Sequence, residues 1–204
     1  MSRAISRDPD RLVLFTDAVV AIAVTLLVLP LVDVVPETVR GHGASSEVFT
    51  EHKAQIYSFL LSFAVIIRLW LVHHRTFEHI RGYTRALMLW NAGWVLAIVV
   101  LPFTTEMVAS YSSHDRFTIG SYIVNVLAAA VCQTVITVIA YRTAGVASEE
   151  DPPTIDAVRG GLSTVLLLVV ALVLGVVFPA VSYWALLLLV LEPLVSRGWR
   201  FAGL

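Results

Sequence analysis

Hydrophobic residues along the chain fall into six long runs separated by polar segments, at roughly 12–32, 54–74, 86–108, 118–141, 157–178 and 180–196. An α-helix needs about 20 apolar residues to cross a bilayer, and most of these runs reach that length. The last run is shorter, and Phe178-Pro179 before it indicates a tight turn within a helical hairpin. The pattern therefore predicts an all-α integral membrane protein with six transmembrane helices, forming one domain over residues 1–204.

The first run has two different faces. Its early acid, Asp17, is followed by no further charge until Asp33. At about 100° per residue, four side chains of this run share an arc of roughly 100°. These four are Ile22, Thr25, Leu26 and Leu29. Thr16 and Asp17 point elsewhere, and a carboxylate inside a membrane usually has a partner because its insertion costs about 2.5–3.5 kcal/mol. The run is thus either an ordinary membrane helix with a polar edge or a helix whose two faces have separate roles.

Lysine and arginine residues lie mostly on one side of the predicted spans. Ten belong to the N-terminal segment, the second and fourth loops and the C-terminal tail, whereas the opposite side has only Arg40, Lys53 and Arg116. Cytoplasmic loops carry the excess of positive charge in membrane proteins. Both termini are therefore expected in the cytoplasm, which an even number of spans also requires, and the protein is expected in the cell membrane.

The composition excludes several classes of protein. Residues are 58% hydrophobic and 14% charged, whereas soluble domains have about a quarter charged. The net charge of −1 gives no electrostatic reason for nucleic-acid binding. The single cysteine, Cys132, cannot form an internal disulfide and is expected to be buried. No pattern typical of catalysis is found, so we do not expect an enzyme. The predominance of arginine over lysine is typical of a bacterial protein from a GC-rich genome.

Two patterns superficially suggest ligand sites. Residues 118–122, Thr-Ile-Gly-Ser-Tyr, are similar to the Thr-Val-Gly-Tyr-Gly filter of many potassium channels. A carbonyl filter needs a preceding pore helix, and the polar connector 109–117 is too short for one. His73 and His74 are adjacent, so on a helix they point about 100° apart and cannot bind one metal ion together. We therefore expect no carbonyl filter, no metal site and no cofactor.

Residues 33–53 are predicted to form a flexible, solvated connector, because Pro36, Gly41 and Gly43 occur there among four acids. Arg68 lies in the middle of the second span, where an apolar residue is expected. Glu106 and Glu192 are predicted near the membrane edges, too far away to pair with it. A partner across a subunit interface and snorkelling toward water remain the alternatives for Arg68.

Two motifs carry a family resemblance. The first run begins with Arg11-x-x-x-Phe15-Thr16-Asp17, and the second ends with Trp70-x-x-His73-His74-x-x-Phe77. Together they resemble the signature of the transmembrane protein 175 family, the lysosomal and prokaryotic potassium channels, in which serine stands at the position of Thr16. Asn91 and the segment 102–104 are also similar to that family. The resemblance implies that Trp70 and one histidine lie near Thr16 and Asp17, where their N–H groups satisfy the carboxylate and tie the first helix to its own subunit.

The resemblance also implies a function. One striped helix cannot enclose a pore alone, so a channel requires several copies around an axis, and the family resemblance implies a homotetramer in membrane lipid with the first helix of each subunit lining the pore. Rings of Ile22, Leu26 and Leu29 are expected to close the path by dewetting. Either Ile22 or Thr25 is expected to set a modest preference for K⁺ over Na⁺ among monovalent cations. The alternatives are a secondary carrier and, less favoured, a membrane protein that binds haem or quinone through His73 or His74.

Overall fold

The computed structural model describes residues 9–201, apart from residues 113, 144, 149 and 180–181. Within this described part the chain is helical and has no β-strand, only an isolated bridge between Ile80 and Ala147. The helices are α1 (Asp10–Leu26), α2 (Leu29–Arg40), α3 (Glu47–Glu51), α4 (Lys53–Glu78), α5 (Arg85–Ser110), α6 (Arg116–Arg142), α7 (Ile155–Val177), the 3₁₀-helix η1 (Ser182–Leu191) and α8 (Glu192–Phe201).

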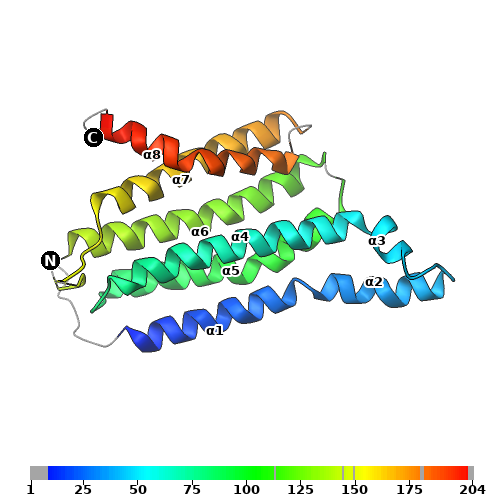
Figure 1. Cartoon of the computed structure of the whole chain (residues 1–204), viewed down its shortest axis with the longest axis horizontal. Helices are drawn as coiled ribbons and strands as arrows, with labels where there is room; N and C mark the ends of the chain where they lie inside the picture. The colour runs from blue at the N-terminus through cyan, green and yellow to red at the C-terminus, as the bar shows by residue number, and fades with distance from the viewer. Residues whose placement is uncertain (1–8, 113, 144, 149, 180–181, 202–204) are drawn as a thin grey trace.

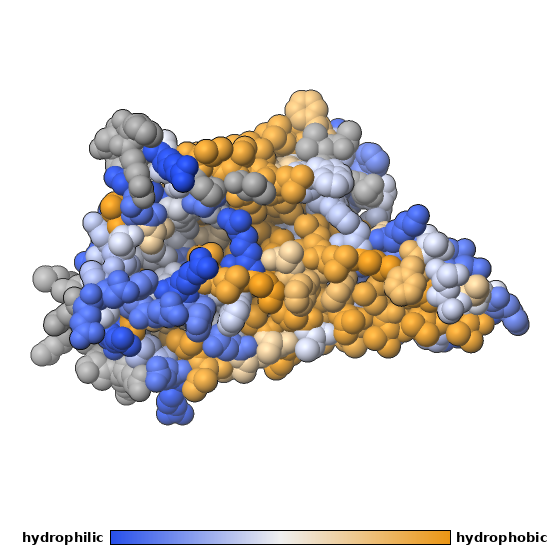
Figure 2. All heavy atoms as spheres, viewed as in Figure 1, coloured by the Kyte–Doolittle hydropathy of each residue, from blue (hydrophilic) through white to orange (hydrophobic). Residues whose placement is uncertain are grey.

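Five helical stretches of the described chain are long and apolar enough to cross a membrane. They are Asp10–Arg40, which joins α1 and α2, and the helices α4, α5, α6 and α7. The last four coincide with predicted apolar runs to within a few residues. Figure 2 shows hydrophobic side chains over the middle of the visible face and hydrophilic ones at both ends, with the larger group on the left. The chain is therefore a multi-pass, all-helical membrane protein.

The long helices lie side by side and alternate in direction, so the start of α1 and the end of α8 lie at the same end of the bundle (Figure 1). α6 is at the centre, because it packs against both α5 and α7, and its side chains are the most extensively buried. α1 lies at the edge and packs on α5 and α4. This position leaves a large part of the α1 surface without a neighbour within the described subunit.

The prediction of a flexible connector over 33–53 is wrong for most of that segment. α2 continues to Arg40, and a short α3 precedes α4. Pro30 lies in the first turn of α2, where a backbone N–H is not needed for a helical hydrogen bond. Pro36 is inside the helix and removes only one such bond. The non-helical connection is limited to residues 41–46, where His42 adopts a left-handed φ of 59°.

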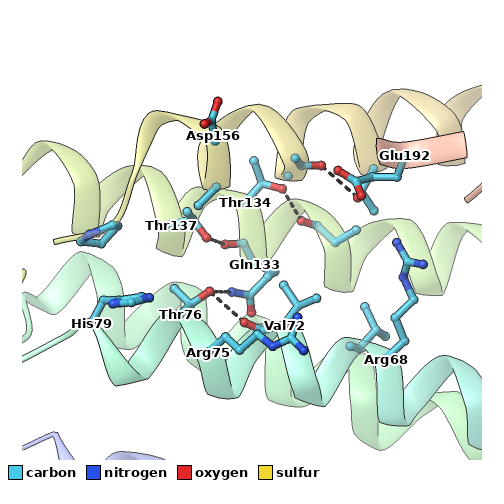
Figure 3. A pocket seen from close by; sticks show the side chains of 17 residues that line it. Arg68, Val72, Arg75, Thr76, His79, Gln133, Thr134, Thr137, Asp156 and Glu192 are labelled. Carbon is cyan, nitrogen blue, oxygen red and sulfur yellow. Dashed lines mark hydrogen bonds between the residues drawn. The ribbon is translucent and has the colours of Figure 1, made fainter. Parts of the chain in front are cut away.

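The structure also corrects the expected position of Glu192. This residue begins α8 after ten residues of 3₁₀-helix, so it lies about 14 Å from the end of α8. Arg68 lies about 15 Å from the same end of the bundle along α4. Both residues line one cavity, and Figure 3 shows the Arg68 side chain extending toward the side on which Glu192 lies. Glu192 is therefore level with Arg68 along the bundle, closer to it than the sequence predicts.

Candidate pore helix and its anchoring network

The striped face predicted on the first helix is exposed on the surface of the subunit. Ile22 is 59% exposed, Leu26 43% and Leu29 52%. Thr25 is also exposed, and its hydroxyl donates to the backbone carbonyl of Ile22 over 2.7 Å. The opposite side of the same stretch is buried at Val20, Ala23 and Leu27. The structure therefore brings the four stripe residues to one face that no other part of the described subunit covers.

Asp17 is held from the opposite side by the second membrane helix. The indole Nε1–H of Trp70 donates to Asp17 Oδ1 over 2.8 Å, joining α4 to α1. The Trp70 ring also stacks on His74, with centroids 5.4 Å apart. A hydrogen bond to a charged acceptor contributes about 1.5–3 kcal/mol, roughly twice a neutral one. The partly buried carboxylate therefore has the donor that a membrane environment requires.

A second chain of hydrogen bonds, through buried side chains, starts at Thr16. Its hydroxyl donates to the Leu12 carbonyl over 2.9 Å and accepts from the side-chain amide of Asn91 over 3.0 Å. Asn91 Oδ1 in turn lies 2.8 Å from His73 Nε2. Since Asn91 Oδ1 can only accept, the proton in this bond belongs to His73 Nε2. Three helices, α1, α5 and α4, are thus joined through side chains that are at most 2% exposed.

Aromatic rings fix the orientation of His73. Its imidazole stacks between Trp94 on α5, at a centroid distance of 4.2 Å, and Phe77 on α4, at 4.4 Å. His74 points away from this site and approaches Glu78, with Nε2 3.6 Å from Oε1. The two adjacent histidines therefore have different surroundings: His73 is buried between two aromatic rings, and His74 lies near Glu78.

Arg11 and Phe15 lie outside this network, although the sequence groups them with it. Both are exposed, Phe15 by 61%. At about 100° per residue they fall on the same side of α1 as Ile22, because their offsets from it are eleven and seven. The helical spacing of positions 11, 15, 22 and 29 is the sequence signal that places Arg11 and Phe15 on the exposed face. The motif thus contributes residues to both faces of α1.

Other buried polar contacts of the described bundle were not predicted from the sequence. The Ser62 hydroxyl lies 3.0 Å from the Tyr122 hydroxyl and accepts from Thr105 over 2.7 Å. In the other half of the bundle, Gln133 donates its amide to the Thr76 hydroxyl over 2.8 Å. Isolated hydroxyl and amide side chains in apolar runs give no spacing pattern, so the sequence offers no signal that would pair them.

The fold and this site define a multi-pass membrane protein whose first helix has two different faces. One face is held by hydrogen bonds to α4 and α5, and the other is exposed on the surface of the described chain. Residues 11–102, which contain every residue of the anchoring network, match the family described as endosomal/lysosomal potassium channel TMEM175. The match agrees with the family that the two motifs of this region indicate.

Relatives named as channels occur in bacteria and in animals. A protein of Chamaesiphon minutus named as a potassium channel is 32% identical over 109 residues, which cover 53% of each chain. A Streptomyces collinus protein named as a potassium channel is 31% identical over 109 residues, covering 53% of this chain and 52% of that one. The human endosomal/lysosomal proton channel TMEM175 is 30% identical over 112 residues, covering 52% and 22% respectively. The aligned part of the chain thus spans about half the length of the bacterial relatives.

Proposed function

We propose that this protein is a cation channel that conducts K⁺ in modest preference to Na⁺ and has its constriction on α1. The observation that carries the proposal is the division of α1 into two faces. One face is bound by Trp70 and Asn91, and the other presents Ile22, Leu26 and Leu29 without a cover in the described subunit. The names of the bacterial relatives support the same function.

A pore requires several copies of this face around a common axis. Closed symmetric assemblies place the same surface of each subunit at the centre, and in a homotetramer four copies of α1 would meet there. The residue Ile22 of each copy would then form an apolar ring, followed by rings of Leu26 and Leu29. Water is unstable in such a narrow apolar collar, so ions are stopped without a carbonyl filter.

The hydroxyl of Thr25 lies on the exposed face between the apolar rings and already donates to a backbone carbonyl. Its oxygen therefore presents lone pairs to the proposed axis, where an ion that has lost part of its hydration shell can bind. Ile22 acts on selectivity through ring diameter, whereas Thr25 acts through oxygen ligands. The anchoring network keeps both at a fixed rotation of α1.

The proposed subunit has six membrane crossings, with both termini in the cytoplasm of a bacterial cell. Beyond the five apolar stretches, η1 and α8 together extend about 35 Å, which is enough for one more crossing. The start of α1 and the end of α8 lie at the same end of the bundle, which carries most of the arginines of the described chain. The positive-inside rule assigns that end to the cytoplasm.

A flux assay on the purified protein in liposomes tests this function. With a K⁺ gradient across the membrane, we expect flux that rises with concentration without saturating at low rate and that falls several-fold when Na⁺ replaces K⁺. Empty liposomes and liposomes with heat-denatured protein are the controls. Slow, saturable flux that depends on a second ion would instead establish a carrier, and absence of any cation flux would refute both.

A further inference from the structure

A cavity of about 410 Å³ lies between α4, α6 and α7, away from the exposed face of α1. One wall carries basic side chains of α4, Arg68 and Arg75, which lie on the same side because they are seven residues apart. The opposite wall is formed by α7 and the start of α8, where Glu192 lies. Leu69, Val72 and other apolar residues complete the lining, so the cavity has both a charged and an apolar part.

The charges of this cavity are unbalanced. Among the described residues, neither Arg68 nor Arg75 has a carboxylate within 4 Å. Asp156, which also lines the cavity, is bound to Arg159 over 3.1 Å, and this leaves Glu192 to face the two arginines. A guanidinium in the middle of a membrane helix is costly without a counter-charge. The cavity therefore favours a ligand with one negative charge.

A buried acceptor in the same cavity requires a hydrogen-bond donor. Gln133 is 5% exposed, and its amide N–H bonds to Thr76, which leaves Oε1 without a partner in the described structure. Buried polar atoms are nearly always hydrogen-bonded, so an occupant of the cavity is expected to donate to this oxygen. The carboxylate of Glu192, which is half-buried, can accept a hydrogen bond from the same occupant. A ligand that suits the cavity thus combines an anionic group with hydroxyls.

We propose that the cavity between α4, α6 and α7 binds an anionic phospholipid with hydroxyls on its headgroup, such as phosphatidylglycerol. The phosphate bonds to the guanidinium groups of Arg68 and Arg75, and the headgroup hydroxyls donate to Gln133 Oε1 and Glu192. The acyl chains leave along the apolar wall toward the surrounding lipid. Basic pockets between membrane helices are typical sites for such headgroups. This site also explains the arginine in the middle of α4, independently of where the pore lies.

Native mass spectrometry of the purified protein in detergent tests the proposal, with lipid added in increasing amounts. We expect phosphatidylglycerol to bind at least tenfold more tightly than phosphatidylcholine, and glycerol phosphate to bind too weakly to be detected at the same concentrations. The double variant Arg68→Gln/Arg75→Gln should lose more than tenfold in phosphatidylglycerol affinity, because each charge-assisted bond accounts for about a factor of ten. The matched control Arg85→Gln removes an exposed arginine outside the cavity and should bind as the parent does.

A second variant keeps the test valid if the double variant does not fold. Ala157 lines the cavity and is exposed, so Ala157→Phe fills the space without removing a charge. It should also lose phosphatidylglycerol binding while its elution volume and melting temperature stay those of the parent. Equal binding of phosphatidylcholine, equal binding of glycerol phosphate, or full binding in a folded cavity variant would each overturn the proposal.

Discussion

The indole of Trp70 donates a hydrogen bond to Asp17 over 2.8 Å, linking residues 53 positions apart on two membrane helices. This bond places the carboxylate on the subunit side of α1 and so determines which side chains point away from the subunit. Thr16 is held by Asn91 on the same side. The rotation of α1 about its own axis is therefore fixed by polar contacts in its first turns. These contacts precede the exposed stripe of Ile22, Leu26 and Leu29 along the chain.

Removing the indole donor should destabilise the subunit. We expect Trp70→Phe to lower the free energy of unfolding by about 1.5–3 kcal/mol, because Asp17 then loses a charge-assisted bond in a partly buried position. Denaturant titration in mild detergent, followed by circular dichroism, measures the change. Trp184→Phe is the control, since Trp184 is 62% exposed and should change the same quantity by about 0.5 kcal/mol or less. Equal losses in the two variants would show that the bond to Asp17 has no special weight.

The chain from Thr16 through Asn91 to His73 should behave as one unit. Thr16→Val and Asn91→Leu each break the bond between them, so the double variant should lose less stability than the sum of the single variants, by about 0.5–3 kcal/mol. Pairing Asn91→Leu with Thr134→Val gives the comparison, because Thr134 bonds to the Ala130 carbonyl and not to Asn91. That pair should be additive within about 0.5 kcal/mol. Additivity in the first cycle would contradict a connected network.

The start of α6 should lose stability in acid. Hydrogen bonds from the side chain and backbone of Thr118 lower the pKa of the Asp115 carboxylate, which caps this helix. Its contribution is complete above the unfolded pKa of about 3.9 and is lost as the pH falls through the lower folded pKa. Asp115→Asn should therefore be less stable than the parent at pH 6, and the difference should shrink in melting curves toward pH 3. A difference that does not change with pH would exclude this charge as its cause.

Cysteine cross-linking tests the symmetric arrangement of α1. The chain has one cysteine, Cys132, which is buried, so Cys132→Ala provides a background without thiols. In that background Ile22→Cys and Leu26→Cys should give disulfide-linked dimers on mild oxidation, since symmetry brings identical positions close to the axis. Leu166→Cys on α7, also exposed, should not. Gels that show linked dimers only for Leu166→Cys would contradict a central α1.

The hydrophobic pattern predicts the helices of the bundle better than the segments between them. α4 to α7 are long apolar runs, and their positions agree with the sequence to within a few residues. α2 was missed because Pro36 and nearby acids are typical of a loop. A proline in the first helical turn costs no helical hydrogen bond, and one inside the helix removes only one, so the helix continues through both.

The candidate site was likewise predicted only in part from the sequence. The two motifs identify Asp17, Trp70 and a pair of adjacent histidines. The sequence does not show which histidine points into the bundle, because only the packing of Trp94 and Phe77 around His73 decides that. The position of Glu192 opposite Arg68 is also not predictable from the sequence. It depends on the rise per residue of η1, which no periodic pattern gives.

Cation flux through Ile22→Asn is the most direct test of an apolar constriction on α1. Asparagine in the ring should hold water, so K⁺ flux into liposomes should rise several-fold and the ratio of K⁺ to Na⁺ flux should fall toward one. Leu166→Asn makes a comparable change on an exposed residue of α7 at a similar distance from the same end of the bundle, and it should leave both quantities unchanged. If Ile22→Asn conducts K⁺ and Na⁺ as the parent does while Leu166→Asn alters the flux, the constriction is not on α1 and the proposed pore is wrong.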